Sequence, residues 1–425
     1  MAGPSLWTYR ILASALLPIA VPVLLLRQWM TGKSRPRFRD RMGRNLPDLG
    51  KDGVWIQAVS VGEVELARRL VTEIRNRAPE LPLSLTATTA TGLTLARQTL
   101  GAALPVFPCP LDLRGPVRRV FEASSPRLVV LVETELWPEM LYRAGACSVP
   151  VAVVNARLSE GSLAAYRRVA RPLRSLLEPL TVVLARTDAD AERFASLGVP
   201  VDRIEVGGNI KYDLEADERP LEWSDEVLRV AGGRQIVVIG STMEGEEAQV
   251  LDALAGVDAD GAAPFIILAP RHPERFDAVA GLLRERGVAF GRRSRPGETP
   301  DAADAFLIDT IGELARAYKL AHLAFIGGSL VPTGGHNPLE PAVWGVPVLS
   351  GPHVHNFREV YREMTTAGGA RLVANTAELR VAAAVWLDDV GLARAAGAAG
   401  RDVVEMNRGA TARTVEALLK LVETG

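Results

Sequence analysis

The chain contains 425 residues, of which 48% are hydrophobic, and its formal net charge is -1 at pH 7. A chain of this length is expected to form about two or three domains, and a charge this close to zero does not indicate a nucleic-acid-binding protein. The two cysteines, Cys109 and Cys147, lie too far apart in the sequence for a metal-binding pair, and such sparse use of cysteine fits a reducing compartment.

The first distinctive segment is an apolar run over residues 11–26, which contains no charged residue and is flanked by Trp7 and Trp29. Flanking aromatic residues are typical of a segment that lies in a membrane. Residues 27–44 contain seven basic residues and one acidic residue, which places the following chain on the cytoplasmic side and attracts anionic lipid. We therefore predict a membrane anchor over residues 1–30. The basic residues follow the run, which argues against a cleaved signal peptide; a buried helix of the first domain is the alternative.

Residues 45–215 alternate short apolar runs with amphipathic helical patterns. This alternation predicts a doubly wound parallel sheet, in which ligands bind beyond the carboxyl ends of the strands. The runs with strand character are residues 54–59, 83–86, 127–132, 149–154 and 181–184.

Carboxylates follow two of these expected strands. Glu63 comes after the first strand and opens a helix, and Glu133 and Glu135 follow the third. All five histidines lie at or beyond position 272, so acid–base chemistry in this half requires another residue type. At a helix N-terminus Glu63 is expected to stay ionised, as a general base must. The alternative is an acid that only compensates the helix dipole.

Residues 216–234 are polar, acidic and poor in strand-forming residues, so we predict an interdomain linker there. Beyond it, a second alternation of strands and helices predicts a second doubly wound sheet. Neither half contains a G-x-G-x-x-G or P-loop motif, so neither an NAD site nor an ATP phosphate site is indicated. The expected strands are residues 235–239, 264–268, 306–308, 322–326 and 346–349.

The most informative stretch covers residues 326–352, where an expected strand ends at glycines and a helix follows. Asn337 suits the N-cap of this helix and Pro338 its first position. Backbone N–H groups of the glycine-rich loop are expected to approach an anion. Glu340, in the first helical turn, is expected to accept two hydrogen bonds from a ribose diol. Arg271, which follows an earlier strand, is placed to bind a phosphate as a bidentate fork, with a surface salt bridge as the alternative.

Residues 326–352 resemble the nucleotide-binding signature of two-domain (GT-B) glycosyltransferases. In detail they resemble the Kdo transferases, which add 3-deoxy-D-manno-octulosonic acid to a lipid A precursor. Four shorter motifs match the same family: SVGE at 60–63, ETELWP at 133–138, NARLS at 155–159 and GNIKYD at 208–213. The resemblance implies an α/β protein of the GT-B class, with two doubly wound Rossmann-like domains facing a cleft.

The resemblance also implies how the chain is divided. We expect an N-terminal hydrophobic membrane-anchor helix over residues 1–30, an acceptor-binding domain over 31–215, the linker over 216–234 and a CMP-Kdo-binding domain over 235–425. The last helix of the chain is a candidate to pack back on the N-terminal domain.

Individual residues inherit roles from the same resemblance. Glu63 corresponds to the general base, Glu133 to a residue that contributes to the transition state, and Lys211 to one that stabilises the departing charge. The implied CMP pocket comprises Arg271, His272, Ile311, Gly312, Glu313, Asn337, Pro338, Leu339 and Glu340.

The implied function is inverting transfer of Kdo from CMP-Kdo to a lipid A precursor, lipid IVA, in lipopolysaccharide core biosynthesis. This acceptor places the enzyme on the cytoplasmic side of the inner membrane, and no cofactor or nucleic-acid partner is expected. Two Asp-x-Asp spacings, at 188–190 and 258–260, imitate the metal motif of the other glycosyltransferase fold. Helix capping explains the first and a polar loop the second, so no metal site is expected.

The sequence departs from the family pattern at Gln57 and Met243, where histidine is common, at Glu139, where asparagine is common, and at Gly161, which replaces arginine. Glu139 and Gly161 lie near the expected acceptor side, which leaves the details of the acceptor open. Two other functions are alternatives at this point: a sugar-nucleotide 2-epimerase of the same fold, and a periplasmic binding protein with two α/β lobes. The hydrophobic N-terminal run argues against the first, and the missing cleavage site argues against the second.

Overall fold

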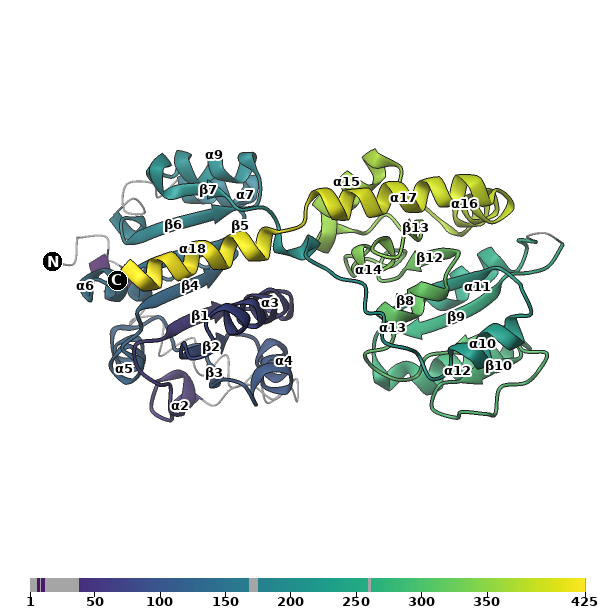
Figure 1. The fold of residues 1–425 in the computed structure, drawn as a ribbon, viewed down its shortest axis with the longest axis horizontal. Helices are drawn as coiled ribbons and strands as arrows, with labels where there is room; N and C mark the ends of the chain where they lie inside the picture. Colours follow the sequence, from purple (N-terminus) through teal and green to yellow (C-terminus); the bar gives the residue numbers. More distant parts are fainter. Residues whose placement is uncertain (1–5, 8, 12–37, 168–174, 259–260, 425) are drawn as a thin grey trace. The chain divides into compact units, whose positions relative to one another are not determined.

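The computed structural model describes residues 6–7, 9–11, 38–167, 175–258 and 261–424. The chain forms two compact units (Figure 1). Unit 1 comprises Met1–Asp213 and Arg408–Gly425, and unit 2 comprises Leu214–Asn407. Each unit is an α/β structure built on a seven-stranded sheet, in which the paired strands run parallel.

The sheet of unit 1 has the strand order β3-β2-β1-β4-β5-β6-β7, so the winding reverses between β1 and β4. Its central strands are buried along their whole length, as in sheets that helices cover on both faces. The strands are β1 (Val54–Ala58), β2 (Leu83–Ala87), β3 (Val106–Pro108), β4 (Leu128–Val132), β5 (Val151–Ala156), β6 (Leu180–Ala185) and β7 (Ile204–Val206).

From β1 onwards the helices of unit 1 alternate with its strands along the chain, as the sequence pattern predicts. They are α2 (Phe38–Arg41), α3 (Val61–Arg77), α4 (Ala90–Leu100), α5 (Arg114–Ser124), α6 (Pro138–Ala146), α7 (Glu160–Arg167), α9 (Asp188–Ser196) and α18 (Ala410–Thr424), with the 3-10 turns η1 (Val201–Arg203) and η2 (Ile210–Tyr212).

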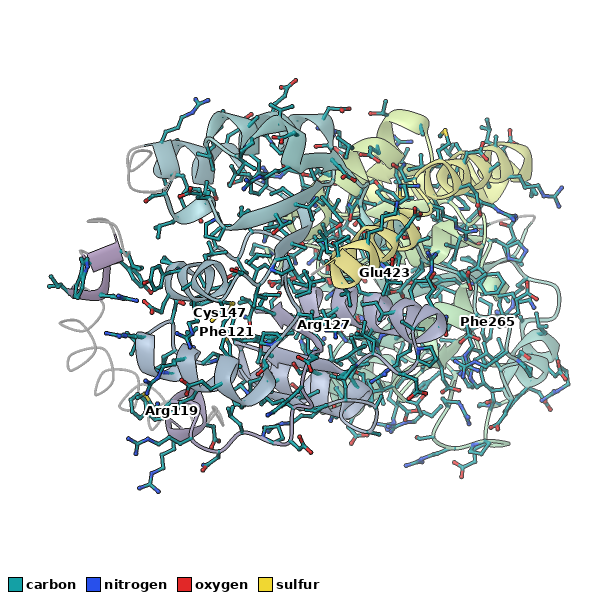
Figure 2. The ribbon with its side chains drawn as sticks, turned by 60° about the vertical axis from the view of Figure 1, so that its left-hand side comes forward. Arg119, Phe121, Arg127, Cys147, Phe265 and Glu423 are labelled. Atoms are coloured by element: carbon teal, nitrogen blue, oxygen red, sulfur yellow. The ribbon has the colours of Figure 1, made fainter. Side chains whose placement is uncertain are left out.

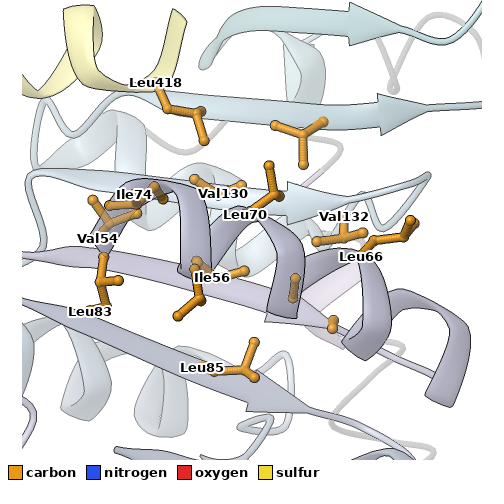
Figure 3. Packing of buried hydrophobic residues seen from close by; sticks show 14 of the residues in the cluster. Val54, Ile56, Leu66, Leu70, Ile74, Leu83, Leu85, Val130, Val132 and Leu418 are labelled. Atoms are coloured by element: carbon orange, nitrogen blue, oxygen red, sulfur yellow. The ribbon is translucent and has the colours of Figure 1, made fainter. Parts of the chain in front are cut away.

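Alternate residues of β1 belong to two separate cores, because successive side chains of a strand point to opposite faces. On one face Ile56 shares a core with Leu70 of α3 and Leu418 of α18 (Figure 3). On the other face the rings of Trp55 and Phe121 of α5 meet edge-on, with 5.6 Å between their centroids; Phe121 is labelled in Figure 2. The strand that leads into Glu63 is therefore held from both sides.

Helix α18 belongs to unit 1 although it follows unit 2 in the sequence. Its residue Leu418 is buried in the core that α3 and β4 also form. The carboxylate of Asp213 accepts hydrogen bonds from the backbone N–H of Gly409, at 2.6 Å, and from that of Thr411. Unit 2 therefore ends at Asn407, and not at residue 425, where we expect the second domain to end. The last helix packs back on unit 1.

The sheet of unit 2 has the strand order β10-β11-β9-β8-β12-β13-β14, which reverses between β8 and β12. Its strands are β8 (Ile236–Thr242), β9 (Phe265–Pro270), β10 (Phe290–Arg292), β11 (Ala305–Leu307), β12 (Leu323–Ile326), β13 (Val348–Ser350) and β14 (Ala370–Leu372). Its helices are α10 (Ser224–Ala231), α11 (Glu246–Leu254), α12 (Phe276–Glu285), α13 (Leu314–Ala317), α14 (Leu339–Ala342), α15 (Arg358–Ala367), α16 (Thr376–Asp388) and α17 (Val390–Met406), with the 3-10 turns η3 (Pro273–Arg275), η4 (Tyr318–Leu320) and η5 (His355–Phe357).

The expected linker over residues 216–234 is part of unit 2 and contains helix α10. Trp223 is 3% exposed, and its ring stacks on that of Phe306 with 5.0 Å between the centroids. Arg234 pairs with Asp304 at 2.8 Å. The acidic composition of this segment obscured an amphipathic helix, whose residues Val227, Val230 and Ala231 are buried.

The expected membrane anchor over residues 1–30 lies outside the described part of the chain, apart from residues 6, 7 and 9–11. Among the residues that are described, no helix has both the length and the apolar character to cross a membrane.

Candidate active site

Three carboxylates gather at the point where the winding of the first sheet reverses. Glu63 lies in the first turn of α3, directly after β1, and Glu133 and Glu135 follow β4. Because β1 and β4 are neighbouring parallel strands, their carboxyl ends meet at one edge of the sheet. Glu133 and Glu135 lie close enough to Glu63 to raise the pKa of its carboxyl group. This edge, at a reversal of strand order, is where doubly wound sheets bind ligands.

Glu63 is buried, with 7% of its surface exposed. One carboxylate oxygen accepts a hydrogen bond from the backbone N–H of Val59 at 2.7 Å, and the other accepts one from the hydroxyl of Ser60 at 2.9 Å. Burial raises the pKa of Glu63 to about 7; the two hydrogen bonds oppose the rise, and the neighbouring carboxylates add to it. With a pKa of about 7, Glu63 is only partly ionised at neutral pH, so the expectation that the helix dipole keeps it ionised is not met. A carboxyl group that titrates near neutrality is well matched to proton transfer.

Glu133 adopts an unusual backbone conformation, with a φ of 64°. Asn155, at the end of the neighbouring strand β5, has a φ of 50°. Left-handed conformations are rare for residues other than glycine and concentrate at functional sites. The carboxylate of Glu133 lies 3.6 Å from the guanidinium of Arg157, so it has a basic neighbour that its surrounding sequence did not show.

Lys211 lies in η2, which three side chains hold in place. The Asn155 side chain, 1% exposed, accepts a hydrogen bond from the backbone N–H of Ile210 at 2.9 Å. The Asn209 side chain accepts one from the N–H of Lys211 at 3.1 Å. The guanidinium of Arg69, on α3, donates to the backbone oxygens of Ile210 and Lys211 at 2.7 and 3.1 Å. The NARLS and GNIKYD motifs are thus joined physically. Nothing in the sequence marks Arg69 as a contact of η2, because an arginine on an amphipathic helix normally faces solvent.

In unit 2 three basic side chains lie near the ends of β9 and β12. Arg271 is exposed and directly follows β9, and His272 is half-buried beside it. Burial and, to a smaller extent, the charges of Arg271 and His272 together lower the pKa of His336 to about 4. The Nε2 atom of His336 is buried and has no hydrogen-bond partner within the described chain. A neutral imidazole beside Arg271 and His272 forms a group that can receive an anion.

The predicted helix after the glycine loop exists and is a short one of four residues. The Asn337 side chain accepts a hydrogen bond from the backbone N–H of Leu339 at 3.1 Å, so it caps the helix. Pro338 occupies the N-cap position of α14, however, and the helix spans only Leu339–Ala342. The Asn337 amide also donates to the carboxylate of Glu340 at 3.3 Å. Asn337 and Glu340 therefore belong to one local network in the first turn.

The glycine loop does not offer its N–H groups in the way we expected. The carboxylate of Glu246, which is 0% exposed, accepts hydrogen bonds from the backbone N–H groups of Gly328 at 2.5 Å and of Ser329 and Leu330 at 2.8 Å each. The N–H of Met243 donates to it as well, at 2.9 Å. The anion-binding concavity that such N–H groups form is thus filled by a carboxylate of the chain itself. The sequence signal was present in GSTMEGEE, where Glu246 opens the helix after β8.

The loop between β11 and α13 holds the remaining predicted residues. Ile311 is 65% exposed, and Gly312 has a φ of 92° that favours glycine. The Glu313 carboxylate accepts hydrogen bonds from Arg293 at 3.0 Å, from the Trp223 indole at 3.2 Å and from the Thr310 hydroxyl. Burial acts to raise the pKa of Glu313, but these hydrogen bonds hold it below its usual value. The Glu313 side chain is thus committed to the interior of unit 2.

Of the two Asp-x-Asp pairs that imitate a metal motif, the first lies at the start of helix α9 and the second is only partly described. Asp190 is 2% exposed; it accepts the N–H of Leu158 at 2.9 Å, and its own N–H donates to Thr187 at 3.1 Å, so this residue supports a helix start. Asp260 lies outside the described residues. Across the described ranges, no group of three or more histidine, cysteine, aspartate or glutamate side chains is arranged to hold a metal ion.

Comparison with known proteins identifies the family. A family model described as 3-deoxy-D-manno-octulosonic-acid transferase (kdotransferase) matches residues 36–214. The 3-deoxy-D-manno-octulosonic acid transferase of Haemophilus influenzae is 33% identical over 98% of this chain and 99% of its own length. That of Bordetella pertussis is 36% identical over 89% of each. A crystal structure of a UDP-N-acetylglucosamine 2-epimerase has a TM-score of 0.53 at 15% identity, covering 84% of this chain and 95% of that one.

The likeness to the epimerase, at this low identity, shows a shared fold and says nothing about activity. Two parallel-sheet α/β units of this kind resemble the GT-B glycosyltransferases. The similarity to the Haemophilus influenzae protein, by contrast, extends over nearly the whole of both chains. The chain therefore belongs to the Kdo transferase family and is a glycosyltransferase of lipopolysaccharide biosynthesis.

Proposed function

We propose that this enzyme transfers Kdo from CMP-Kdo to a lipid A precursor, lipid IVA, with inversion at the anomeric carbon. The observation that carries the proposal is the buried carboxyl group of Glu63, with a pKa raised to about 7, beside Glu133 and Glu135 at the switch point of the first sheet. A group of this kind is suited to take a proton from a sugar hydroxyl at neutral pH.

In the proposed reaction Glu63 accepts the proton of the acceptor hydroxyl while the oxygen attacks the anomeric carbon. Attack from the face opposite the leaving CMP inverts that centre in a single displacement. Positive charge develops on the sugar ring, and a nearby carboxylate that does not move during the reaction stabilises it. We assign this role to Glu133. Its strained backbone and its position at the end of β4 support the assignment.

The departing CMP carries negative charge on its phosphate. We assign Arg271 and His272 to that charge, together with Lys211 as the family resemblance implies. Neutral His336 is placed to donate a hydrogen bond, since its buried Nε2 lacks a partner in the described chain. The N–H groups of residues 328–330 take no part in the proposal, because Glu246 already occupies them.

The nucleoside part of CMP is assigned to two loops of unit 2. Glu340, with Asn337, Pro338 and Leu339 around it, is the candidate for the ribose hydroxyls. The loop of Ile311, Gly312 and Glu313 offers backbone groups and one exposed apolar side chain for the base. We place the enzyme at the cytoplasmic face of the inner membrane, where the lipid acceptor lies, with residues 1–30 as its anchor.

The decisive experiment uses the full-length protein in detergent with radiolabelled CMP-Kdo and lipid IVA. The expected product is lipid IVA with Kdo attached, identified by its mass, and CMP. Turnover of CMP-Kdo without a Kdo-bearing lipid would remove the proposed acceptor, whereas absence of turnover with any acceptor would remove the proposed donor.

A further inference from the structure

The described N-terminal residues, 6–7 and 9–11, lie beside helix α6 of unit 1 (Figure 1). The Tyr9 hydroxyl donates a hydrogen bond to the Asp112 carboxylate at 2.7 Å. The Arg10 guanidinium donates two to the Glu139 carboxylate, from Nε at 2.8 Å and from Nη2 at 2.7 Å. These contacts join positions more than 100 residues apart in the sequence, so they dock one segment on another.

The docked contact is buried and charged. Only 2% of the Glu139 side chain and 15% of the Arg10 side chain are exposed. The Arg10 guanidinium also lies over the rings of Trp7 and Tyr142, 5.7 and 4.8 Å from their centroids. A bidentate pair with aromatic contacts is among the stronger charged interactions. Loss of Arg10 would leave the Glu139 charge buried without its partner, which is strongly unfavourable.

The same contacts control where α6 begins. The Asp112 carboxylate accepts the backbone N–H groups of Glu139 and Met140, at 3.0 Å each, and so caps the helix. Trp137 holds the N-cap position but supplies no side-chain hydrogen bond, so the cap comes from Asp112, which Tyr9 in turn holds. Residues 133–137, which carry Glu133 and Glu135, therefore connect the fixed end of β4 to a helix start that the N-terminal segment secures.

We propose that Tyr9 and Arg10 are positioning residues for the reaction: by docking on Asp112 and Glu139 they fix the loop 133–137 that presents the site carboxylates. The proposal rests on the proposed function for the role of that loop. Glu139, a departure from the family pattern, is thereby explained as the partner of Arg10.

The proposal also couples the site to whatever precedes the first domain. Trp7 and Ile11, four residues apart, are 54% and 64% exposed, whereas Leu6 is 2% exposed. In this docked segment Leu6 is therefore buried, whereas Trp7 and Ile11 form an apolar side that is exposed. Arg10 is the last residue before the apolar run 11–26. The proposed anchor is thus tied to the loop 133–137 through two side chains.

The test compares Arg10→Gln and Tyr9→Phe with wild type, as full-length proteins in detergent, where membrane attachment does not limit the rate. Hydrogen exchange of the amides of Glu139 and Met140 is expected to quicken about tenfold in both variants, because the cap is loosened. In the transfer assay kcat is expected to fall about tenfold while KM for CMP-Kdo stays unchanged, since the residues assigned to CMP binding, apart from Lys211, lie in unit 2. Arg10→Lys, which retains the charge, should recover part of kcat.

Arg39→Gln is the matched control, because Arg39 is an exposed arginine on α2. It is expected to leave both exchange and kcat unchanged. Unaltered exchange of the two amides in Arg10→Gln would overturn the docking role, and unaltered kcat despite faster exchange would overturn the positioning role. The exchange measurement needs no substrate, so it tests docking even if the proposed donor and acceptor are wrong.

Discussion

Replacement of Glu63 by glutamine tests the raised pKa and the proposed base together. The carboxyl of Glu63 has an ordinary pKa of 4.5 and titrates at about 7 in the folded protein. Between these values the folded protein holds a proton that the unfolded chain has released, so the free energy of unfolding falls as the pH rises from about 4.5 through about 7. Ionised Glu63 therefore costs about 3 kcal/mol of stability above neutral pH, since one pKa unit corresponds to about 1.4 kcal/mol.

Glutamine keeps the shape of Glu63 and cannot ionise. In urea denaturation at about pH 8, Glu63→Gln is expected to be more stable than wild type by up to about 3 kcal/mol, and the difference should vanish near pH 4. Active-site residues that reduce stability in this way are a known compromise between stability and function. An equal difference at both pH values would refute the raised pKa.

The same substitution is expected to lower turnover about 100-fold to 10,000-fold, the usual contribution of a general base. The wild-type rate should rise with pH up to about 7 and then level off, as the base loses its proton. Glu65→Gln is the control: the Glu65 side chain is 42% exposed and pairs with Arg68 at 3.0 Å, so neither rate nor stability should change appreciably. If Glu63→Gln keeps more than about a tenth of the rate while Glu133→Gln is inactive, Glu133 is the base.

Three further predictions concern the donor site and the anchor. Glu340→Ala is expected to weaken CMP binding at least about tenfold by calorimetry, because charge-assisted hydrogen bonds to the ribose contribute about 1.5–3 kcal/mol each; affinity unchanged within about twofold would end its ribose role. Glu246→Gln is expected to lower the free energy of unfolding by about 2–6 kcal/mol in chemical denaturation, because its amide nitrogen then faces two buried N–H donors. An unchanged denaturation midpoint would contradict the conclusion that Glu246 fills the concavity. Deletion of residues 1–28 should release the protein from membranes in high salt, and a truncated protein that still sediments with them would exclude this segment as the main attachment.

The central strands could be predicted from the sequence because they are continuous apolar runs. The run at 127–132 contains the whole of β4, and the run at 83–86 covers most of β2. The strands that were missed are β3, β7, β10 and β14, which are the edges of the two sheets. An edge strand has three residues here and is partly exposed, so it needs no apolar run and leaves little pattern to read.

Positions in the first site were predictable, but their chemical state was not. Glu63 and Glu133 lie where the βα pattern places them, at the carboxyl ends of adjacent strands. The pKa of Glu63 depends on its burial and on carboxylates about 70 residues away in the sequence. The ion-pair partner of Glu133, Arg157, and the arginine that holds the backbone of Ile210, Arg69, are likewise distant in sequence or lie on another element. Local pattern shows only that Glu63 opens a helix, and it shows neither its burial nor the neighbouring carboxylates.

The glycine loop shows the same limit in unit 2, with a consequence for the donor. Its glycines indicated N–H groups free for an anion, but Glu246 is 82 residues from Gly328 in the sequence and fills the position. In the proposed function a donor phosphate in this unit is therefore assigned to side chains, namely Arg271, His272 and His336. Binding by a partly exposed arginine is screened by salt more strongly than binding by buried backbone dipoles. Glu246 consequently fixes the shape of the loop through four backbone N–H groups, and the proposed function assigns recognition of the donor charge to residues at the strand ends instead.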